Sequence, residues 1–260
     1  MNAHEICTLI CGAERKAAEL ILRARDIIAE NKTSARDVVT EYDRRVQELL
    51  VGELRASVPD AHFFCEESDA PESVDSPRLF IIDPIDGTMN FVHGLHHSCI
   101  SVAYAERGRV LAGAIYNPYL DELFHAVRGE GAFLNGRPIR VTDAPLSGSL
   151  VSFGTSPFRP ELYDRGFAIA RRLQDACLDL RRGGAAALDL CSVAAGRVGL
   201  FFEYNLSLWD YAAGALLVEE AGGVCRQPDG APLLYTGEKG PVAAGAPAAL
   251  EAFLALTKEL

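Results

Sequence analysis

One feature restricts the possible folds of this chain more than any other: an apolar run, Leu79–Ile82, leads directly into two aspartates, Asp83 and Asp86. A short run of aromatic and aliphatic residues of this kind predicts a buried strand. Pro84 fixes φ and has no N–H, so the chain must turn as it leaves that strand. The two carboxylates then converge on one side of the turn, where something must neutralise them.

These carboxylates need a positive partner, because two like charges ~4 Å apart repel by about 4 kcal/mol at an effective dielectric constant of ~20. The sequence has no lysine or arginine between Arg78 and Arg107. A hard divalent cation with oxygen ligands therefore explains the pair better than a salt bridge does. An isolated D-x-x-D pair would more simply cap a turn. Here, however, Glu66 and Glu67 also follow an apolar run, and Asp210 lies at a strand-to-helix junction. Together these acids predict a two-metal site.

The net charge limits the partners of the chain. Asp and Glu number 36 against 25 Lys and Arg, which gives a formal charge of −11. An acidic surface repels nucleic-acid phosphates and anionic membranes, so we expect no direct nucleic-acid binding and no membrane partner. A phosphorylated substrate would also be repelled unless bound cations reverse the local sign, which again favours a metal site.

Helical periodicity dominates the start of the chain. Apolar residues on one face predict a single amphipathic helix over 3–29. The polar segment 32–40 is expected to be a loop. Thr40 can cap a second helix, about 41–57, which Pro59 closes.

The rest of the chain mixes strands and helices. Two short strands, 62–65 and 79–82, precede an antiparallel meander over 98–141, and the turn formers of 142–148 mark an internal boundary. Beyond it, strands alternate with helices, which is typical of an α/β fold. The expected strands are 150–154, 177–182, 199–204 and 242–245, and the expected helices are 160–175, 186–197, 208–221 and 247–258.

The cysteines and the N-terminus indicate the compartment. The seven cysteines are widely spaced and contain no C-x-x-C pair, so we interpret them as buried free thiols. The N-terminus has no basic region, and it carries Glu5 and Glu14 where a signal peptide would be apolar. We expect a cytoplasmic protein.

Four motifs in order along the chain resemble those of the inositol monophosphatase family. The segment 81–94, IIDPIDGTMNFVHG, is similar to the family's D-P-I/L-D-G-T/S signature, and 66–68 resembles its G-E-E motif. The segment 208–214 resembles its W-D-x-A-A-G motif, and Lys32 with 37–43 resembles its N-terminal K-x(n)-D-x-V-T-x-x-D segment. The likeness covers nearly the whole chain, and four co-linear motifs are far more specific than one.

The resemblance implies a fold, a cofactor and a role for each site residue. The fold would be a layered α-β-α-β-α sandwich of the inositol monophosphatase and fructose-1,6-bisphosphatase type. It would form a single catalytic unit over 1–260, whose half 1–145 supplies most metal ligands and whose half 146–260 supplies Asp210 and the substrate side. Two Mg²⁺ ions would be held, with a third, weaker ion near Glu66. The first ion's ligands would be Glu66, Asp83 and the carbonyl of Ile85, and the second ion's would be Asp83, Asp86 and Asp210.

The resemblance also implies catalytic and substrate-binding residues. Asp43, Glu66 and Thr88 would be catalytic, with Thr88 and Asp43 forming a pair that orients and deprotonates the attacking water. Gly87 and Thr88 would offer backbone N–H groups to the phosphate, at a helix start that favours anions. The alcohol side of the substrate would contact Gly184, Ala185, Ala186, Glu203 and Asp210.

The chain departs from the family pattern at a few positions. Cys65 replaces the usual glycine before the glutamates, and Ala185 replaces a common hydroxyl residue. His96 and His97 replace a more apolar, proline-containing stretch. With His93 they could also bind a transition metal, but the oxygen-rich acids already explain a hard-ion site. These departures affect the expected substrate and leave the expected ligands intact.

The resulting functional hypothesis is hydrolysis of a small phosphorylated polyol, inositol 1-phosphate first, by a water that two metal ions activate. Histidinol phosphate, fructose 1,6-bisphosphate and adenosine 3′,5′-bisphosphate are alternative substrates. A different class of hypothesis keeps the fold as a non-catalytic partner in an RNA or transcription complex. The resemblance further implies lithium sensitivity and a homodimer.

Overall fold

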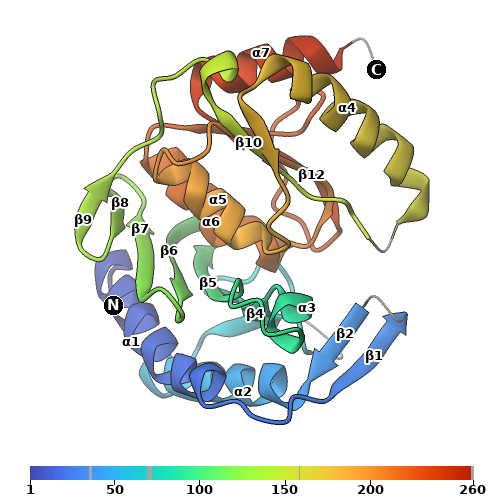
Figure 1. The fold of residues 1–260 in the computed structure, drawn as a ribbon. Helices are drawn as coiled ribbons and strands as arrows, with labels where there is room; N and C mark the ends of the chain where they lie inside the picture. The colour runs from blue at the N-terminus through green and yellow to red at the C-terminus, as the bar shows by residue number, and fades with distance from the viewer. Residues whose placement is uncertain (35–36, 69–71, 158, 259–260) are drawn as a thin grey trace.

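Two β-sheets and six helices form the layers of the fold, seen here in a computed structural model that describes residues 1–34, 37–68, 72–157 and 159–258. From one side of the molecule to the other, these layers are two outer helices, a seven-stranded sheet, two inner helices and a five-stranded sheet. Further helices cover the outer face of the second sheet (Figure 1). The alternation confirms the α-β-α-β-α sandwich that the sequence predicts.

The first sheet and its outer helices come from the N-terminal part of the chain. Helices α1 (Ala3–Leu22) and α2 (Glu41–Ser57) cover one face of the sheet, and the short helix α3 (Thr88–Val92) follows its second strand. Its strands, in spatial order, are β3 (His62–Cys65), β4 (Leu79–Asp86), β5 (Cys99–Glu106), β6 (Arg109–Asn117), β7 (Glu122–Val127), β8 (Gly131–Leu134) and β9 (Arg137–Ile139). Strands β5 to β9 pair in antiparallel order, which confirms the predicted meander.

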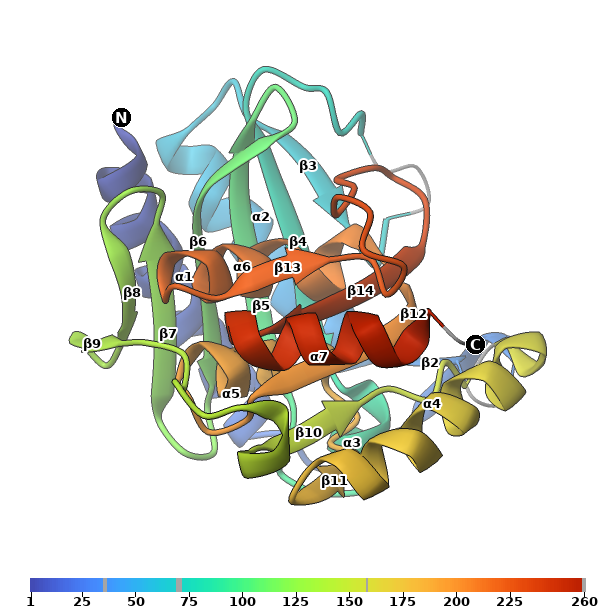
Figure 2. The same ribbon diagram turned by 90° about the horizontal axis from the view of Figure 1, so that it is seen from above.

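The second sheet comes from the C-terminal part. In spatial order it contains β11 (Asp179–Arg181), β10 (Leu150–Phe153), β12 (Leu200–Leu206), β14 (Gly240–Gly245) and β13 (Val224–Arg226). Strands β10, β11 and β12 are parallel, whereas β14 is antiparallel to β12 because the unpredicted strand β13 lies between them in the chain. The strands of the two sheets run in crossing directions (Figure 2).

The inner helices join the sheets into one core. Helices α5 (Ala186–Ala194) and α6 (Leu208–Glu220) are packed between the sheets, and nearly all of their residues are buried. Helices α4 (Tyr163–Ala176) and α7 (Pro247–Thr257) cover the outer face of the second sheet, as Figure 1 shows. Two short 3₁₀ turns, η1 (Leu146–Gly148) and η2 (Pro160–Leu162), precede β10 and α4.

Two predictions for the N-terminal segment are wrong. Helix α1 ends at Leu22 rather than at 29, and Asp26 adopts a left-handed backbone (φ 49°), which a continuing α-helix does not tolerate. Ile28, assigned to the buried face, is 76% exposed. The segment expected to be a loop contains the antiparallel strands β1 (Ala29–Ser34) and β2 (Asp37–Thr40). The cap at Thr40 is confirmed, because its side chain accepts the N–H groups of Tyr42 and Asp43.

No helix in the described part of the chain has the length and apolar character needed to cross a membrane.

Candidate functional site

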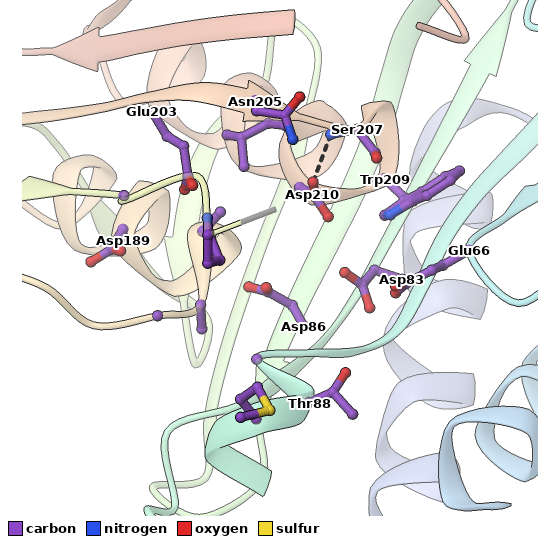
Figure 3. A pocket seen from close by; sticks show the side chains of 18 of the residues that line it. Glu66, Asp83, Asp86, Thr88, Asp189, Glu203, Asn205, Ser207, Trp209 and Asp210 are labelled. Carbon is purple, nitrogen blue, oxygen red and sulfur yellow. Dashed lines mark hydrogen bonds between the residues drawn. The ribbon is translucent and has the colours of Figure 1, made fainter. Parts of the chain in front are cut away.

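A pocket of about 340 Å³ opens where the two sheets and the inner helices meet. Every predicted site residue except Asp43 lines it, and Asp43 lies directly behind Thr88. Figure 3 shows Glu66 and Asp83 at one end, Asp86, Asp210 and Thr88 near the middle, and Glu203 toward the other end. The lining residues from the predicted set are Glu66, Asp83, Ile85, Asp86, Gly87, Thr88, Gly184, Ala185, Ala186, Glu203 and Asp210.

Strand register brings the first acids together. Strands β3 and β4 are parallel neighbours, with Cys65 beside Ile82, so Glu66, directly after β3, lies next to Asp83 in β4. The N–H of Glu66 donates to the carbonyl of Ile82 at 3.1 Å, which holds the end of β3 in this register. The two carboxylates therefore meet because the last residue of β3 pairs with the residue before Asp83.

Asp83 is the most isolated of these carboxylates. Its side chain is 2% exposed, and Oδ1 is buried with no hydrogen-bond partner among the described residues. Burial raises its pKa well above the usual range, and the charges of Glu66, Asp86 and Asp210 raise it further. A buried carboxylate oxygen with no donor costs free energy unless it takes a proton or a cation.

Backbone donors hold the next two acids in place. The N–H of Ala187 in α5 donates to Oδ2 of Asp86 at 2.8 Å, and burial raises the pKa of Asp86 to about 7. Asp210 is in the first turn of α6, where its Oδ2 accepts the N–H of Ser207 at 2.6 Å. Burial, together with the charge of Glu66, raises the pKa of Asp210 well above its usual range.

Two lysines approach the acids, although the sequence places none near Asp83 along the chain. Strand β1 brings Lys32 to Glu66, with Nζ 3.0 Å from Oε1, and Lys32 also donates to Glu67. Lys239 lines the pocket, and its charge opposes, in small part, the rise in the pKa of Asp210 that burial causes. The fold thus supplies cations that the sequence argument excluded, yet Oδ1 of Asp83 has no hydrogen-bond partner among the described residues.

Thr88 and Asp43 form the predicted pair. Oγ1 of Thr88 lies 3.3 Å from Oδ1 of Asp43 and 3.1 Å from the carbonyl oxygen of Ile85, so its hydrogen is shared between two acceptors. Asp43 is fully buried, and Thr40 donates to its Oδ2 through both its N–H and its hydroxyl. Burial raises the pKa of Asp43 to about 6, against the lowering effect of those two hydrogen bonds.

Close backbone approach shapes the turn after β4. Gly87 has φ 84°, and a Cβ there would lie 3.0 Å from the carbonyl oxygen of His97 and 3.1 Å from the Cβ of Ala185. Glycine is required at this turn because both the conformation and the space exclude a side chain. The turn therefore brings the start of α3 against the strip 184–186.

The far end of the pocket has its own carboxylates. Glu203, in the middle of β12, is 9% exposed, and its Oε1 accepts the N–H of Ser156 at 3.0 Å. A Cβ at Gly154 would lie only 1.8 Å from Oε2 of Glu203, so glycine leaves room for this carboxylate. Burial raises the pKa of Glu203 to about 6, against the lowering effect of Arg182.

The sequence argument missed several lining residues. Asp189 in α5 is 6% exposed, and burial and the charge of Glu203 raise its pKa to about 7. Asn205, Trp209 and Lys239 also line the pocket. Asp189 lies only three residues beyond Ala186, but nothing in the sequence distinguishes it from a surface acid of a short helix.

The oxygen ligands of the pocket suit a hard cation, although they are not yet arranged around one. Across the four described segments, no three histidine, cysteine, aspartate or glutamate side chains lie close enough together to hold one ion. The three histidines of 93–97 therefore do not form such a group either. The carboxylate and carbonyl oxygens around the bare Oδ1 of Asp83 are nevertheless the ligands that Mg²⁺ prefers. To bind an ion, the Glu66 carboxylate would have to break its ion pair with Lys32.

Known proteins resemble this chain over nearly its full length. The model of the family described as the inositol monophosphatase family matches residues 2–260. A protein named Nus factor SuhB from Pasteurella multocida (strain Pm70) is 43% identical over 216 residues, which cover 82% of this chain and 81% of that protein.

Solved structures share the fold. The extragenic suppressor protein suhB from Bartonella henselae superposes with a TM-score of 0.91 at 33% identity, covering 98% of this chain and 99% of that one. An IMPase/NADP phosphatase complexed with Mg²⁺ and phosphate superposes with a TM-score of 0.88 at 27% identity, covering 98% of this chain and 95% of that one.

Proposed function

The chain belongs to the inositol monophosphatase family, and from that premise we propose that it hydrolyses small phosphate monoesters with bound Mg²⁺. The observation that supports this most is the buried Oδ1 of Asp83, which has no hydrogen-bond partner among the described residues and is surrounded by further carboxylates. A buried carboxylate oxygen with no donor destabilises the folded protein, and a bound divalent cation would remove that destabilisation.

The proposed ligands follow the predicted division. Glu66, Asp83 and the carbonyl of Ile85 would hold a first ion, and Asp83, Asp86 and Asp210 a second. A third ion near Glu66 would compete with Lys32 for the same carboxylate. When bound, such ions lower the pKa of water and neutralise charge on phosphate and on the departing oxygen.

The protein's own groups would orient the nucleophile. When Thr88 donates its hydroxyl hydrogen to Oδ1 of Asp43, its oxygen is left as an acceptor toward a water in the pocket. Asp43 can take up a proton because its pKa lies near 6 rather than near its ordinary value. The N–H groups of Gly87 and Thr88 would then bind the phosphate oxygens.

The far end of the pocket supports a polyol as the leaving alcohol. Glu203 and the strip of Gly184, Ala185 and Ala186 border this end, and Asp189 adds a second buried carboxylate. Carboxylates there would accept hydrogen bonds from substrate hydroxyls, so inositol 1-phosphate is the proposed substrate. Histidinol phosphate, whose alcohol bears a cationic group, is the main alternative.

Phosphate release from a panel of esters tests the proposal. We expect turnover of inositol 1-phosphate to exceed that of histidinol phosphate, fructose 1,6-bisphosphate and adenosine 3′,5′-bisphosphate at saturating Mg²⁺. Faster turnover of histidinol phosphate would instead assign the acidic end to an amino alcohol. No phosphate release from any ester would contradict a catalytic role.

A second candidate function is supported by one observation: the Pasteurella relative is named a Nus factor. That name is at odds with the expectation that this chain has no nucleic-acid partner. We therefore also propose membership of a transcription complex, through protein contacts rather than through RNA, because the net charge of −11 disfavours phosphate binding. Affinity capture from its own cell extract, with and without ribonuclease, tests this, and loss of the partners after ribonuclease treatment would contradict protein contacts.

Two further proposals rest on family likeness alone. We propose a homodimer in the cytoplasm. Light scattering that gives the mass of one chain at micromolar concentration would contradict the dimer, and cell fractionation tests the location.

A further inference from the structure

Asp86 links the first sheet to the inner helix α5. It ends β4 in the first sheet, and its Oδ2 accepts the N–H of Ala187 at the start of α5. The same oxygen faces a second donor, the thiol of Cys99, at 3.7 Å. This is an ordinary length for a hydrogen bond from sulfur, so two donors converge on one oxygen of this carboxylate.

Strand pairing determines where that thiol lies. Cys99 begins β5 opposite Asp86, beyond an irregularity in the register that separates Asp83 from Asp86. The residue is fully buried. A thiol with an ordinary pKa of about 8.5 keeps its hydrogen at neutral pH, so the Cys99 thiol can act as a donor to this carboxylate.

We propose that Cys99 is a positioning residue for Asp86. Its thiol and the Ala187 N–H both donate to Oδ2, so that Oδ1 is the oxygen left to bind a cation in the pocket. A carboxylate oxygen accepts about two hydrogen bonds, and two donors therefore leave Oδ2 little capacity for an ion. The inference rests on the proposed function, because it takes Asp86 as a metal ligand. The unpartnered Oδ1 of Asp83 in the same pocket independently indicates that a cation binds there.

The competing explanation is that Cys99 only fills space in the core, as buried cysteines commonly do. Cys225 in β13 is a matched control for that role. It is 2% exposed, and its thiol donates to the carbonyl oxygen of Ala215 at 3.8 Å, within the core rather than on a carboxylate. Loss of either sulfur should lower stability, but only Cys99 should change the binding of a cation.

The experiment is a Mg²⁺ titration of thermal stability on the full chain, without substrate. Binding to the native state stabilises it by RT ln(1 + c/Kd) at a Mg²⁺ concentration c, so the dependence of Tm on Mg²⁺ concentration gives the dissociation constant Kd for the ion. We expect Cys99→Ala to raise this Kd about 2- to 10-fold, the range of one modest hydrogen bond. Cys99→Ser, which keeps a donor, should raise Kd less than Cys99→Ala does, and Cys225→Ala should leave Kd unchanged while still lowering Tm.

The outcomes separate the inference from the proposed function. An unchanged Kd for Mg²⁺ in Cys99→Ala, with a normal Mg²⁺ response in the parent protein, would overturn the positioning role alone. An equal shift in Cys225→Ala would show that general loosening of the core explains the effect, and would also overturn it. No Mg²⁺ response in the parent protein would overturn the metal site itself.

Discussion

Replacing Glu203 by glutamine should separate recognition of the alcohol from the chemistry at phosphorus. Oε1 of Glu203 accepts the Ser156 N–H at 3.0 Å, and the glutamine carbonyl can keep that contact. The second oxygen, against Gly154, would become an amide NH₂ and could no longer accept from a substrate hydroxyl. The variant therefore changes one acceptor without releasing the 154–156 loop.

The size of the effect follows from that lost contact. A hydrogen bond to a charged group contributes ~1.5–3 kcal/mol, which corresponds to a fall of about 10- to 100-fold in kcat/KM. We expect this fall with inositol 1-phosphate and almost none with p-nitrophenyl phosphate, because the carboxylates around Asp83 and the Thr88–Asp43 pair are unchanged. Steady-state kinetics on both esters above pH 7, where Glu203 with its pKa of about 6 is ionised, measure the ratio.

Gly154→Ala provides a matched check, since its Cβ would lie 1.8 Å from Oε2 and would displace the same carboxylate. It should produce the same selective loss. Equal losses on both esters in Glu203→Gln would refute this reasoning, and would show that the residue supports the site as a whole.

Three other predictions concern the metal ligands and the core. Asp210→Asn should weaken one ion, so the loss of phosphate release should be partly recovered at higher Mg²⁺, and a loss that no Mg²⁺ concentration relieves would contradict this. Li⁺ should bind near Asp86 and Asp210 after the alcohol leaves and inhibit uncompetitively, and competitive kinetics would argue against that site. Glu14 is fully buried, neither of its carboxyl oxygens has a hydrogen-bond partner among the described residues, and burial raises its pKa well above the usual range. Its contribution to stability is therefore present below about pH 4.5 and lost as pH rises, so Glu14→Gln should gain Tm relative to the parent more at about pH 8.5 than at about pH 5. An equal difference in Tm at both pH values would contradict the neutral state of Glu14.

The predictable part of the site depends on local chain features. The runs before Glu66 and Asp83 are each predicted as strands from four residues, and they are neighbouring parallel strands whose register places Glu66 next to Asp83. Asp210 follows a capping serine at the start of a helix, which is also a local pattern. Short-range signals of this kind identify the acids Glu66, Asp83, Asp86 and Asp210. The rest of the predicted lining comes from the family resemblance and not from local patterns.

The other contacts of the site join segments that are distant in the sequence, and no local sequence pattern predicts such contacts. Lys32 reaches Glu66 because β1 pairs with β2, whereas the polar composition of 32–40 indicates a loop. The first helix ends at Leu22, and Asp26 beyond it has a left-handed backbone that its residue type permits but does not require. Cys99 faces Asp86 because an irregularity shifts the register of two strands, and no composition rule predicts such a shift.

The ligands of the proposed ions define the central claim, and Asp83 is the residue that both ions would share. The most direct measurement is phosphate release from inositol 1-phosphate by the parent protein and by Asp83→Asn, each after EDTA treatment and after Mg²⁺ is added back. We expect no release after EDTA, full recovery of the parent with Mg²⁺, and almost none in Asp83→Asn at any Mg²⁺ concentration. Release that survives thorough EDTA treatment, or near-normal release by Asp83→Asn at saturating Mg²⁺, would contradict the carboxylate-held metal site.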